Sequence, residues 1–384
     1  MNLMQPDLIK KLFQQHKEPS LFGRYITNGH IEPLLKNLSS KVSLSVIGRS
    51  VLNKPIYGLK IGEGSKRLLL WSQMHGNEST TTKALFDLLN TLSDSNSSYS
   101  NILKACTFYI IPILNPDGAE RYTRLNANEI DLNRDAQDLT QPESRVLRDA
   151  FNAFKPDYCF NLHGQRTIFS AGKTNHPATV SFLAPAQDHA CTITENRKIA
   201  MELIGVMNAG LQFEIPNQVG VYDDAFNLNC VGDTFQSLNV PTVLFEAGHY
   251  NNDYQREFTR ELIYRAYLLC FDYISNNNIT GTGYKPYLDI PENDKCFYDI
   301  IIRNTLMDNK IIDVAIQYEE RLVDNTVFFV PMVQKIESLP EFYGHKEIDA
   351  EGSAVLSADG MPLKLSSENV FVMLNNEKIT LLVE

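Results

Sequence analysis

The sequence lacks any long hydrophobic run. Its most continuous apolar stretches, such as residues 68–71 and 327–331, fall far short of the roughly 20 residues that a membrane-spanning helix needs. Residues 1–20 also contain no continuous apolar segment followed by a small-residue cleavage site, which a secretory signal would have. These two absences lead us to expect a cytoplasmic protein without a membrane partner.

Paired cysteines and an excess of positive charge are missing too. The six cysteines are scattered and form no CxxC pair, and without an export signal we expect buried free thiols rather than disulfides. The 35 lysines and arginines are outnumbered by 46 aspartates and glutamates, which gives a net charge of -11. Such a charge opposes binding to a nucleic-acid backbone.

What is present is the composition of a folded globular protein, with 43% hydrophobic and 21% charged residues in a chain of 384. In most of the chain, short apolar runs alternate with segments of helical periodicity, which predicts an α/β domain with a mainly parallel, buried sheet flanked by helices. After the polar stretch 276–283 the runs become β-rich. We therefore assign residues 1–279 to the α/β domain and 280–384 to a small C-terminal β domain.

Three of the predicted strands end in polar residues. RLLLWSQ runs into His75 and Glu78, YCFNL runs into His163, and VPTVLF runs into Glu246. Because the carboxyl ends of strands in an open α/β sheet form the rim where ligands bind, we expect these side chains to converge. Two imidazoles and one carboxylate can hold Zn²⁺ with a position left for water, and a further carboxylate can act as base. The first three residues are thus candidate metal ligands, and Glu246 is the candidate base.

Each of these residues alone has a simpler interpretation. An H-x-x-E motif often occurs by chance, and a histidine at a strand end is more often a hydrogen-bonded structural residue. A glutamate beside a glycine can cap a neighbouring helix. Their combination at one predicted sheet edge favours the metal site.

The loop between the first and second candidate strands carries two arginines. The run NPDG at 115–118 predicts a tight turn after a strand. Arg124 and Arg134 are ordinary surface residues if the following loop is solvated. If that loop folds over the sheet edge, Arg134 offers a planar fork for a carboxylate, and Arg124 can place positive charge beside a developing oxyanion.

Together, the motifs HGNE, NPDG, TRLN, DLNR, LHG and LFEAG resemble, in order and general spacing, those of the zinc carboxypeptidases of the M14, carboxypeptidase A-like family. The segment IGRSVLNKPIYGLKIG also looks like that family's opening strand hairpin. The resemblance implies a mixed, mainly parallel sheet flanked by helices and one zinc ion bound by His75, Glu78 and His163. It also implies hydrolysis of the C-terminal amide bond of peptides.

The same resemblance implies roles for further residues. Glu246 would act as general base and then general acid for a zinc-activated water, and Arg124 would support the oxyanion. Asn133 and Arg134 would bind the free α-carboxylate of the substrate. Asp131 would hydrogen-bond a ligand imidazole, most simply that of His75, and fix its tautomer.

The sequence departs from the family pattern in two places. The aromatic residue that usually follows DLNRN in the family is absent, because Asp135 and Ala136 follow Arg134 here. The tyrosine that closes over the substrate terminus has no clean counterpart, although Tyr222 and Phe226 lie in the right region. We take Tyr222 as the candidate. The interpretation of Tyr222 as a core or surface tyrosine is at least equally supported. The preferred substrate side chain stays open.

Two other functions stay open as well. The succinylglutamate desuccinylase and aspartoacylase group shares H-G-N-E, DLNR and a catalytic glutamate and carries a β-rich C-terminal domain, so N-acyl amino acids are alternative substrates. The segment NPDGAERYTRLN is more typical of the peptidases. A non-catalytic binding protein is the third interpretation, and it would fit better if a ligand or the base were missing. The sequence sets no oligomeric state.

The remaining histidines and the acidic pairs are interpreted as residues without a catalytic or metal-binding role. Carboxylates at 223–224 and 319–320 are expected on solvated faces, and His249 is at most a neighbour of the site. Five further histidines have no partner at ligand spacing and are expected at the surface or in loops, namely His16, His30, His176, His189 and His345.

Overall fold

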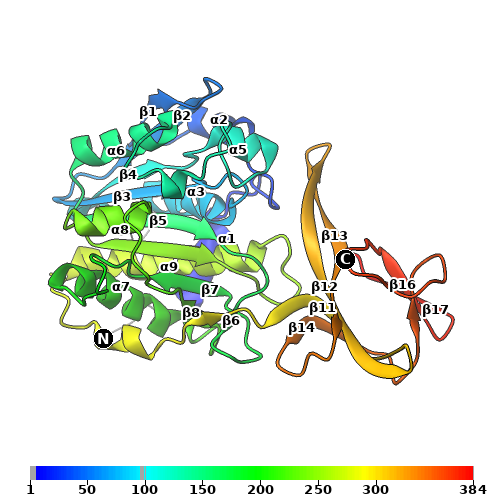
Figure 1. The fold of residues 1–384 in the computed structure, drawn as a ribbon. Coiled ribbons are helices and arrows are strands. Elements are labelled where there is room, and N and C mark those ends of the chain that lie inside the picture. Colours follow the sequence, from blue (N-terminus) through cyan, green and yellow to red (C-terminus); the bar gives the residue numbers. More distant parts are fainter. Residues whose placement is uncertain (1–5, 96–98, 100, 384) are drawn as a thin grey trace.

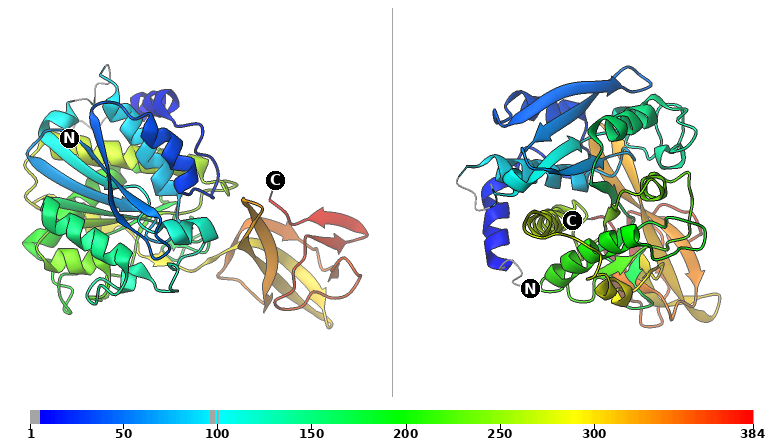
Figure 2. Two further views of the ribbon diagram at one scale, coloured as in Figure 1. Left: turned by 90° about the horizontal axis from the view of Figure 1, so that it is seen from above. Right: turned by 90° about the vertical axis from the view of Figure 1, so that its left-hand side faces the viewer.

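The computed structural model describes residues 6–95, 99 and 101–383. They form a larger α/β domain and a smaller β domain, which lie at the left and right of Figure 1. The left view of Figure 2 shows the same separation and places the N-terminal helices on the α/β domain. None of the helices in the described ranges is both long and apolar enough to cross a bilayer.

An eight-stranded sheet forms the centre of the α/β domain. In spatial order its strands are β1 (Val42–Arg49), β2 (Pro55–Ile61), β4 (Cys106–Ile111), β3 (Lys66–Ser72), β5 (Tyr158–Gly164), β9 (Thr242–Ala247), β7 (Val180–Leu183) and β8 (Val219–Val221). The four middle strands from β4 to β9 run parallel, whereas β1, β2 and β7 introduce antiparallel pairs. This confirms the predicted mixed, mainly parallel sheet.

Helices flank this sheet on both faces, as predicted. They are α1 (Pro6–His16), α2 (Asn28–Lys36), α3 (Thr80–Ser93), α4 (Ile102–Ala105), α5 (Pro116–Arg121), η1 (Leu132–Arg134), α6 (Pro142–Phe154), α7 (Glu195–Leu211), α8 (Val231–Ser237), α9 (Glu257–Asn276) and η2 (Lys285–Asp289). On β3, Leu68 and Leu70 pack in one hydrophobic cluster with α3, α7 and α9, whereas Leu69 and Trp71 pack in a second with α6 and α8. Successive strand residues point to opposite faces, so this unbroken apolar run suits a strand that is buried on both sides.

The C-terminal domain consists of two small sheets, as its β-rich sequence predicts. Their strands are β11 (Phe297–Met307), β12 (Lys310–Val323), β13 (Thr326–Glu337) and β14 (Tyr343–Asp349), followed by β15 (Val355–Leu356), β16 (Phe371–Leu374) and β17 (Glu377–Thr380). Side chains from both sheets, including Ile300, Ile316 and Val372, share one hydrophobic core. The domain therefore has a core of its own.

The segment that connects the domains packs on the α/β domain. Ile279, Tyr287 and Ile290 belong to the core of that domain. Nearby, β10 (Asn293–Asp294) pairs with β6 (Ser170–Ala171). The boundary between residues 279 and 280 stays a prediction, and the sheet of the β domain begins with β11.

Glu320 of β12 joins the two domains. Its carboxylate pairs with Arg24 at 3.1 Å and accepts a hydrogen bond from the Tyr122 hydroxyl. Glu319 beside it is exposed, but Glu320 is half-buried. The expectation that both lie on a solvated face is therefore wrong for Glu320, because a cationic partner lets the carboxylate leave water.

Two of the histidines expected at the surface or in loops are enclosed instead. His16 is buried, and its ring nitrogens contact the Leu12 carbonyl at 3.0 Å and Asp94 at 3.2 Å. His345 stacks on Phe297, and its Nε2 lies 2.8 Å from the Thr167 carbonyl. The expectation is wrong for these two because contacts distant in sequence cover them. The other three are exposed as expected.

All six cysteines are free, as expected. Burial is complete for only some of them. Cys191 and Cys230 are half-buried, whereas the buried thiols are Cys106, Cys159, Cys270 and Cys296.

Asp87 in α3 and Arg260 in α9 form a fully buried ion pair. Two guanidinium nitrogens of Arg260 donate to the carboxylate at 2.6 and 2.7 Å, and neither side chain is exposed. Because Asp87→Ala would leave the buried guanidinium without its main counter-ion, we expect it to lower the free energy of unfolding by about 3–5 kcal/mol. Denaturant titration followed by circular dichroism measures this loss.

Glu337→Ala is the control for this prediction. Glu337 pairs with Lys335 at 2.7 Å, but its side chain is 55% exposed. An exposed pair of this kind contributes at most about 1 kcal/mol. Equal losses in the two variants would contradict the importance of the buried pair.

Candidate metal centre and cleft

Two turns of the chain pack tightly beside the end of β3. A Cβ on Gly76 would come within 2.0 Å of the Gly118 carbonyl carbon, so only glycine allows this approach. Asn115 accepts a hydrogen bond from Gly118 N at 2.8 Å and donates through Nδ2 to the Met74 carbonyl at 3.2 Å. The NPDG turn therefore has a structural role, because it holds the HGNE turn in place.

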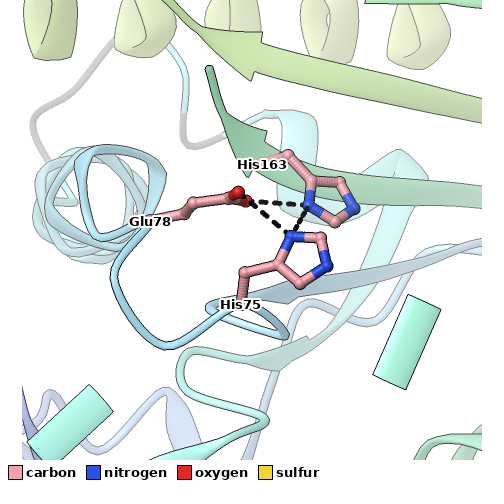
Figure 3. Close-up of side chains that lie close together, drawn as sticks. All are labelled: His75, Glu78 and His163. Atoms are coloured by element: carbon pink, nitrogen blue, oxygen red, sulfur yellow. Dashed lines mark hydrogen bonds and ion pairs between the residues drawn. The ribbon is translucent and has the colours of Figure 1, made fainter. Parts of the chain in front are cut away.

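His75, Glu78 and His163 form a compact group at the sheet edge (Figure 3). Nδ1 of His75 and Nδ1 of His163 lie 3.0 and 2.9 Å from the two Glu78 oxygens and 3.1 Å from each other. One potential ligand atom from each side chain lies within 4.8 Å of the others. The turn after β3, the residue before the α3 cap and the end of β5 thus bring the three predicted ligands together.

The contact between His75 and Asp131 indicates that a cation fits this group. Nε2 of His75 lies 3.0 Å from Asp131 Oδ1, so the ring donates its N–H there and the carboxylate accepts it. A neutral ring then turns the lone pair of Nδ1 toward Glu78, 3.0 Å away. Two acceptors at this distance need a proton or a metal cation between them.

The donor set also suits zinc. Two imidazole nitrogens and one carboxylate are the usual protein ligands of a zinc ion that keeps one position open. Two ligand atoms of a tetrahedral zinc lie about 3.3 Å apart when each bond is ~2.0 Å, and the two Nδ1 atoms are 3.1 Å apart. The residues present therefore fit a zinc ion.

Electrostatic interactions within the group keep its carboxylates ionised. Burial alone would raise the pKa of Glu78, but the imidazoles of His75 and His163 hold that pKa well below its usual range. Burial likewise opposes ionisation of Asp131, and His75 and Arg124 lower its pKa. The pKa of His75 is raised by Glu78 and Asp131 against the effect of burial, whereas burial lowers the pKa of His163. Two ionised carboxylates thus surround His75.

Glu246 and Arg124 lie beside this group. Glu246 on β9 is the strand-pairing partner of His163, and its Oε2 is shielded from solvent without a hydrogen-bond partner among the described residues. Burial and the charge of Glu78 raise the pKa of Glu246 well above its usual range. Arg124 pairs with Asp131 at 3.0 Å and approaches Glu78 to 3.5 Å. Both side chains line the cavity that the predicted ligands line.

This first cavity has a volume of about 430 Å³ and also contains the predicted substrate-binding residues. Asn133, Arg134 and Tyr222 all line it. The backbone N–H of Val231, at the start of α8, donates to Asn133 Oδ1 at 3.0 Å, which leaves the Asn133 amide NH₂ for a ligand. Tyr222 is half-buried, with its ring 5.3 Å from that of Phe169. Every predicted site residue therefore lies in or beside one site.

Several lining residues have no role in the sequence-based predictions. Gln165 and Arg166 line the cavity, and their position directly after His163-Gly164 was a usable signal. Asp233, in the first turn of α8, also lines it, and burial raises the pKa of its carboxyl to about 7; no motif marks this residue. His249 is buried with its ring 4.6 Å from that of Tyr254.

Comparison with known proteins agrees with this geometry. Residues 28–156 match the profile of the zinc carboxypeptidase family, peptidase M14. Carboxypeptidase SOL1 of Arabidopsis thaliana is 30% identical over 183 residues, which cover 41% of this chain and 37% of the relative. These two matches support a relationship of the chain to the M14 zinc carboxypeptidase family. Carboxypeptidase E of Caenorhabditis elegans is 28% identical to this chain over 151 residues, or 32% of each chain.

Solved structures of carboxypeptidases share the fold of this protein. Carboxypeptidase A of Helicoverpa armigera superposes with a TM-score of 0.51 at 16% identity, over 68% of this chain and 77% of its own. A metallo-carboxypeptidase of Burkholderia cenocepacia gives 0.50 at 20% identity, over 63% and 67%. The sequence match covers only about a third of each of the two curated relatives above. His163 and Glu246 lie beyond the residues matched by the family profile. The structure places His163 beside His75 and Glu246 in the same cavity.

Asp131 should strengthen metal binding by orienting His75. Because the carboxylate accepts the Nε2 proton and leaves Nδ1 free as a ligand, we expect Asp131→Asn to lower the affinity of the protein for zinc by about 10–100-fold. Competition with a chromogenic zinc chelator measures the affinity.

Asp138→Asn is the control, since Asp138 is an exposed residue of the same loop. It should bind zinc like the natural protein. Equal zinc affinity in the Asp131→Asn variant and this control would show that Asp131 does not orient a ligand.

Proposed function

We propose that this protein is a zinc-dependent carboxypeptidase that releases single residues from the C-termini of peptides. The observation that carries the proposal is the set of groups along one cavity. A triad that can hold a cation, a carboxylate whose Oε2 has no hydrogen-bond partner among the described residues, and a guanidinium lie together. The guanidinium of Arg134 and the amide of Asn133 line the same cavity. This set supplies what hydrolysis of a terminal peptide bond requires.

The site would act on two groups of the substrate, the reacting carbonyl and the free α-carboxylate. A zinc ion held by the triad would supply Lewis acidity toward water and the peptide carbonyl. Glu246 would take a proton from the attacking water and return it to the leaving amine. Arg124 would place positive charge beside the carbonyl oxygen as that oxygen becomes anionic.

Recognition of the terminus would rest on the neighbouring loop. The guanidinium of Arg134 and the amide NH₂ of Asn133 would donate to the α-carboxylate, so that the last peptide bond lies at the triad. Tyr222, which directly follows β8, would cover the terminal residue of the substrate. We further propose cytoplasmic peptides as the substrates, without a nucleic-acid or membrane partner.

N-acyl amino acids are the alternative substrates, because the chain carries a β-rich C-terminal domain beside its cleft. The decisive experiment offers zinc-loaded protein a pool of free-carboxyl peptides, the same peptides amidated, and N-acyl amino acids. Mass spectrometry identifies the products, and a chelator control tests dependence on the metal. We expect loss of one residue from the free-carboxyl peptides alone; cleavage of only the N-acyl amino acids would select the alternative, and no cleavage would favour a binding protein.

Glu246→Gln separates catalysis from metal binding. The amide cannot accept the proton, so we expect kcat to fall by about 10²–10⁴-fold while zinc content stays at one ion per chain. Atomic absorption of the purified variant measures the metal. Full activity of this variant would exclude Glu246 as the base.

Arg134→Gln should change the preference for a free carboxylate. Loss of charge-assisted hydrogen bonds should lower kcat/KM for free-carboxyl peptides by about 10–100-fold, with little effect on any cleavage of their amidated forms. The exposed Arg121 provides the control variant Arg121→Gln. This variant should keep the natural ratio of kcat/KM for free-carboxyl peptides to kcat/KM for amidated peptides. An unchanged ratio in both variants would exclude Arg134 as the carboxylate-binding residue.

A further inference from the structure

A second cavity, of about 370 Å³, adjoins the candidate metal centre. It shares Glu78, Arg124 and residues 164–166 with the first cavity but not the candidate carboxylate-binding residues Asn133 and Arg134. A large part of its wall belongs to the β domain, namely Asp299, Gln317, Tyr318, Glu319, Glu320 and Phe329. The β domain therefore reaches the edge of the candidate active site.

Hydrogen bonds between the domains hold this wall in place. Gln317 Nε2 donates to the Thr167 hydroxyl at 2.6 Å, and the Tyr254 hydroxyl donates to Asp299 at 3.0 Å. Within the β domain, the backbone N–H of Tyr318 donates to Asp299 at 2.7 Å. Together with the pair between Arg24 and Glu320, these contacts make the cavity a built feature of the fold.

The direction of a bound substrate points to this cavity. If the α-carboxylate lies at Arg134, the C-terminal residue occupies the first cavity and the scissile bond lies at the triad. The chain before that bond must then leave the triad on another side. The second cavity begins at Glu78 and Arg124, so it provides the path.

The wall also carries polar atoms that lack partners. Gln317 is 6% exposed, and its amide nitrogen donates to Thr167 and to Asp299. Its Oε1 takes part in neither of these two hydrogen bonds. This Oε1, and Oδ1 of Asn77 on the HGNE turn, are shielded from solvent without a donor among the described residues. Both residues line the second cavity. An unpaired buried acceptor is costly, and the backbone N–H groups of a peptide are donors of the kind these atoms lack.

We propose that the β domain forms the wall of an upstream subsite, which binds the peptide segment preceding the scissile bond. This inference rests on the proposed carboxypeptidase function. It assigns peptides with several residues before the scissile bond, rather than N-acyl amino acids, as the preferred substrates. The β domain is then part of the substrate-binding cleft.

The test compares substrates of increasing length on the natural protein and two variants. The substrates are an N-acetyl amino acid and N-acetyl peptides of two, three and four residues, all with the same C-terminal residue. For the natural protein, we expect kcat/KM to rise with length. Glu319→Trp, which places an indole at the exposed rim, should reduce kcat/KM at least tenfold for the longest peptide and far less for the shortest substrate. Gln317→Leu, which removes the acceptor, should reduce it about three- to tenfold for the long peptides.

Glu368→Trp is the matched control for the rim variant. Glu319 and Glu368 both pair with Arg321, but Glu368 is not among the residues that line the second cavity. It should keep the natural length dependence. Thermal unfolding and zinc content of all three variants report on their folding.

The outcomes separate this inference from the proposed function. Chelator-sensitive cleavage without any dependence on length would overturn the upstream subsite and leave the carboxypeptidase intact. An equal loss on all lengths in Glu319→Trp, or the same behaviour of Glu319→Trp and Glu368→Trp, would also overturn it. No release of a residue from any peptide would instead overturn the proposed function itself.

Discussion

Hydrogen bonds between parallel strands set the positions on which the candidate site depends. The pairing of β5 with β9 places His163 opposite Glu246. The pairing of β3 with β5 brings the end of β3, and with it the turn that carries His75, to the same edge. A shift of one residue in either register would turn these side chains to the other face of the sheet. The loop that carries Arg124 and the first residue of α8, which donates to Asn133, are arranged around this edge.

The sheet-edge chemistry could be predicted from sequence because it depends on local rules. Apolar runs that end in His75, His163 and Glu246 mark strands, and the carboxyl ends of neighbouring parallel strands must meet. The loop residues Arg124 and Asp131 needed the family resemblance, because nothing local shows that their loop folds back onto His75. Spacing within short motifs was therefore informative, whereas loop paths were not.

Features that depend on packing between distant segments could not be predicted. His16 and Glu320 have polar sequence neighbours, yet tertiary contacts cover His16 and half-bury Glu320. Gln317 lies in a strand of the β domain and carries no motif, although the docked domain places it beside the candidate metal centre. The periodic patterns of a strand report which face is buried, but not which domain covers it.

Glu320 lies in β12, so its contacts with the α/β domain form late in the synthesis of the chain. It holds Arg24, whose carbonyl accepts the Ser79 hydroxyl at 2.5 Å at the start of α3, and Tyr122, which precedes Arg124 by two residues. Domains generally fold in the order of their synthesis. A nascent chain that has completed the α/β domain therefore still lacks the contacts of Glu320 with Arg24 and Tyr122, which can form only after translation has passed β12.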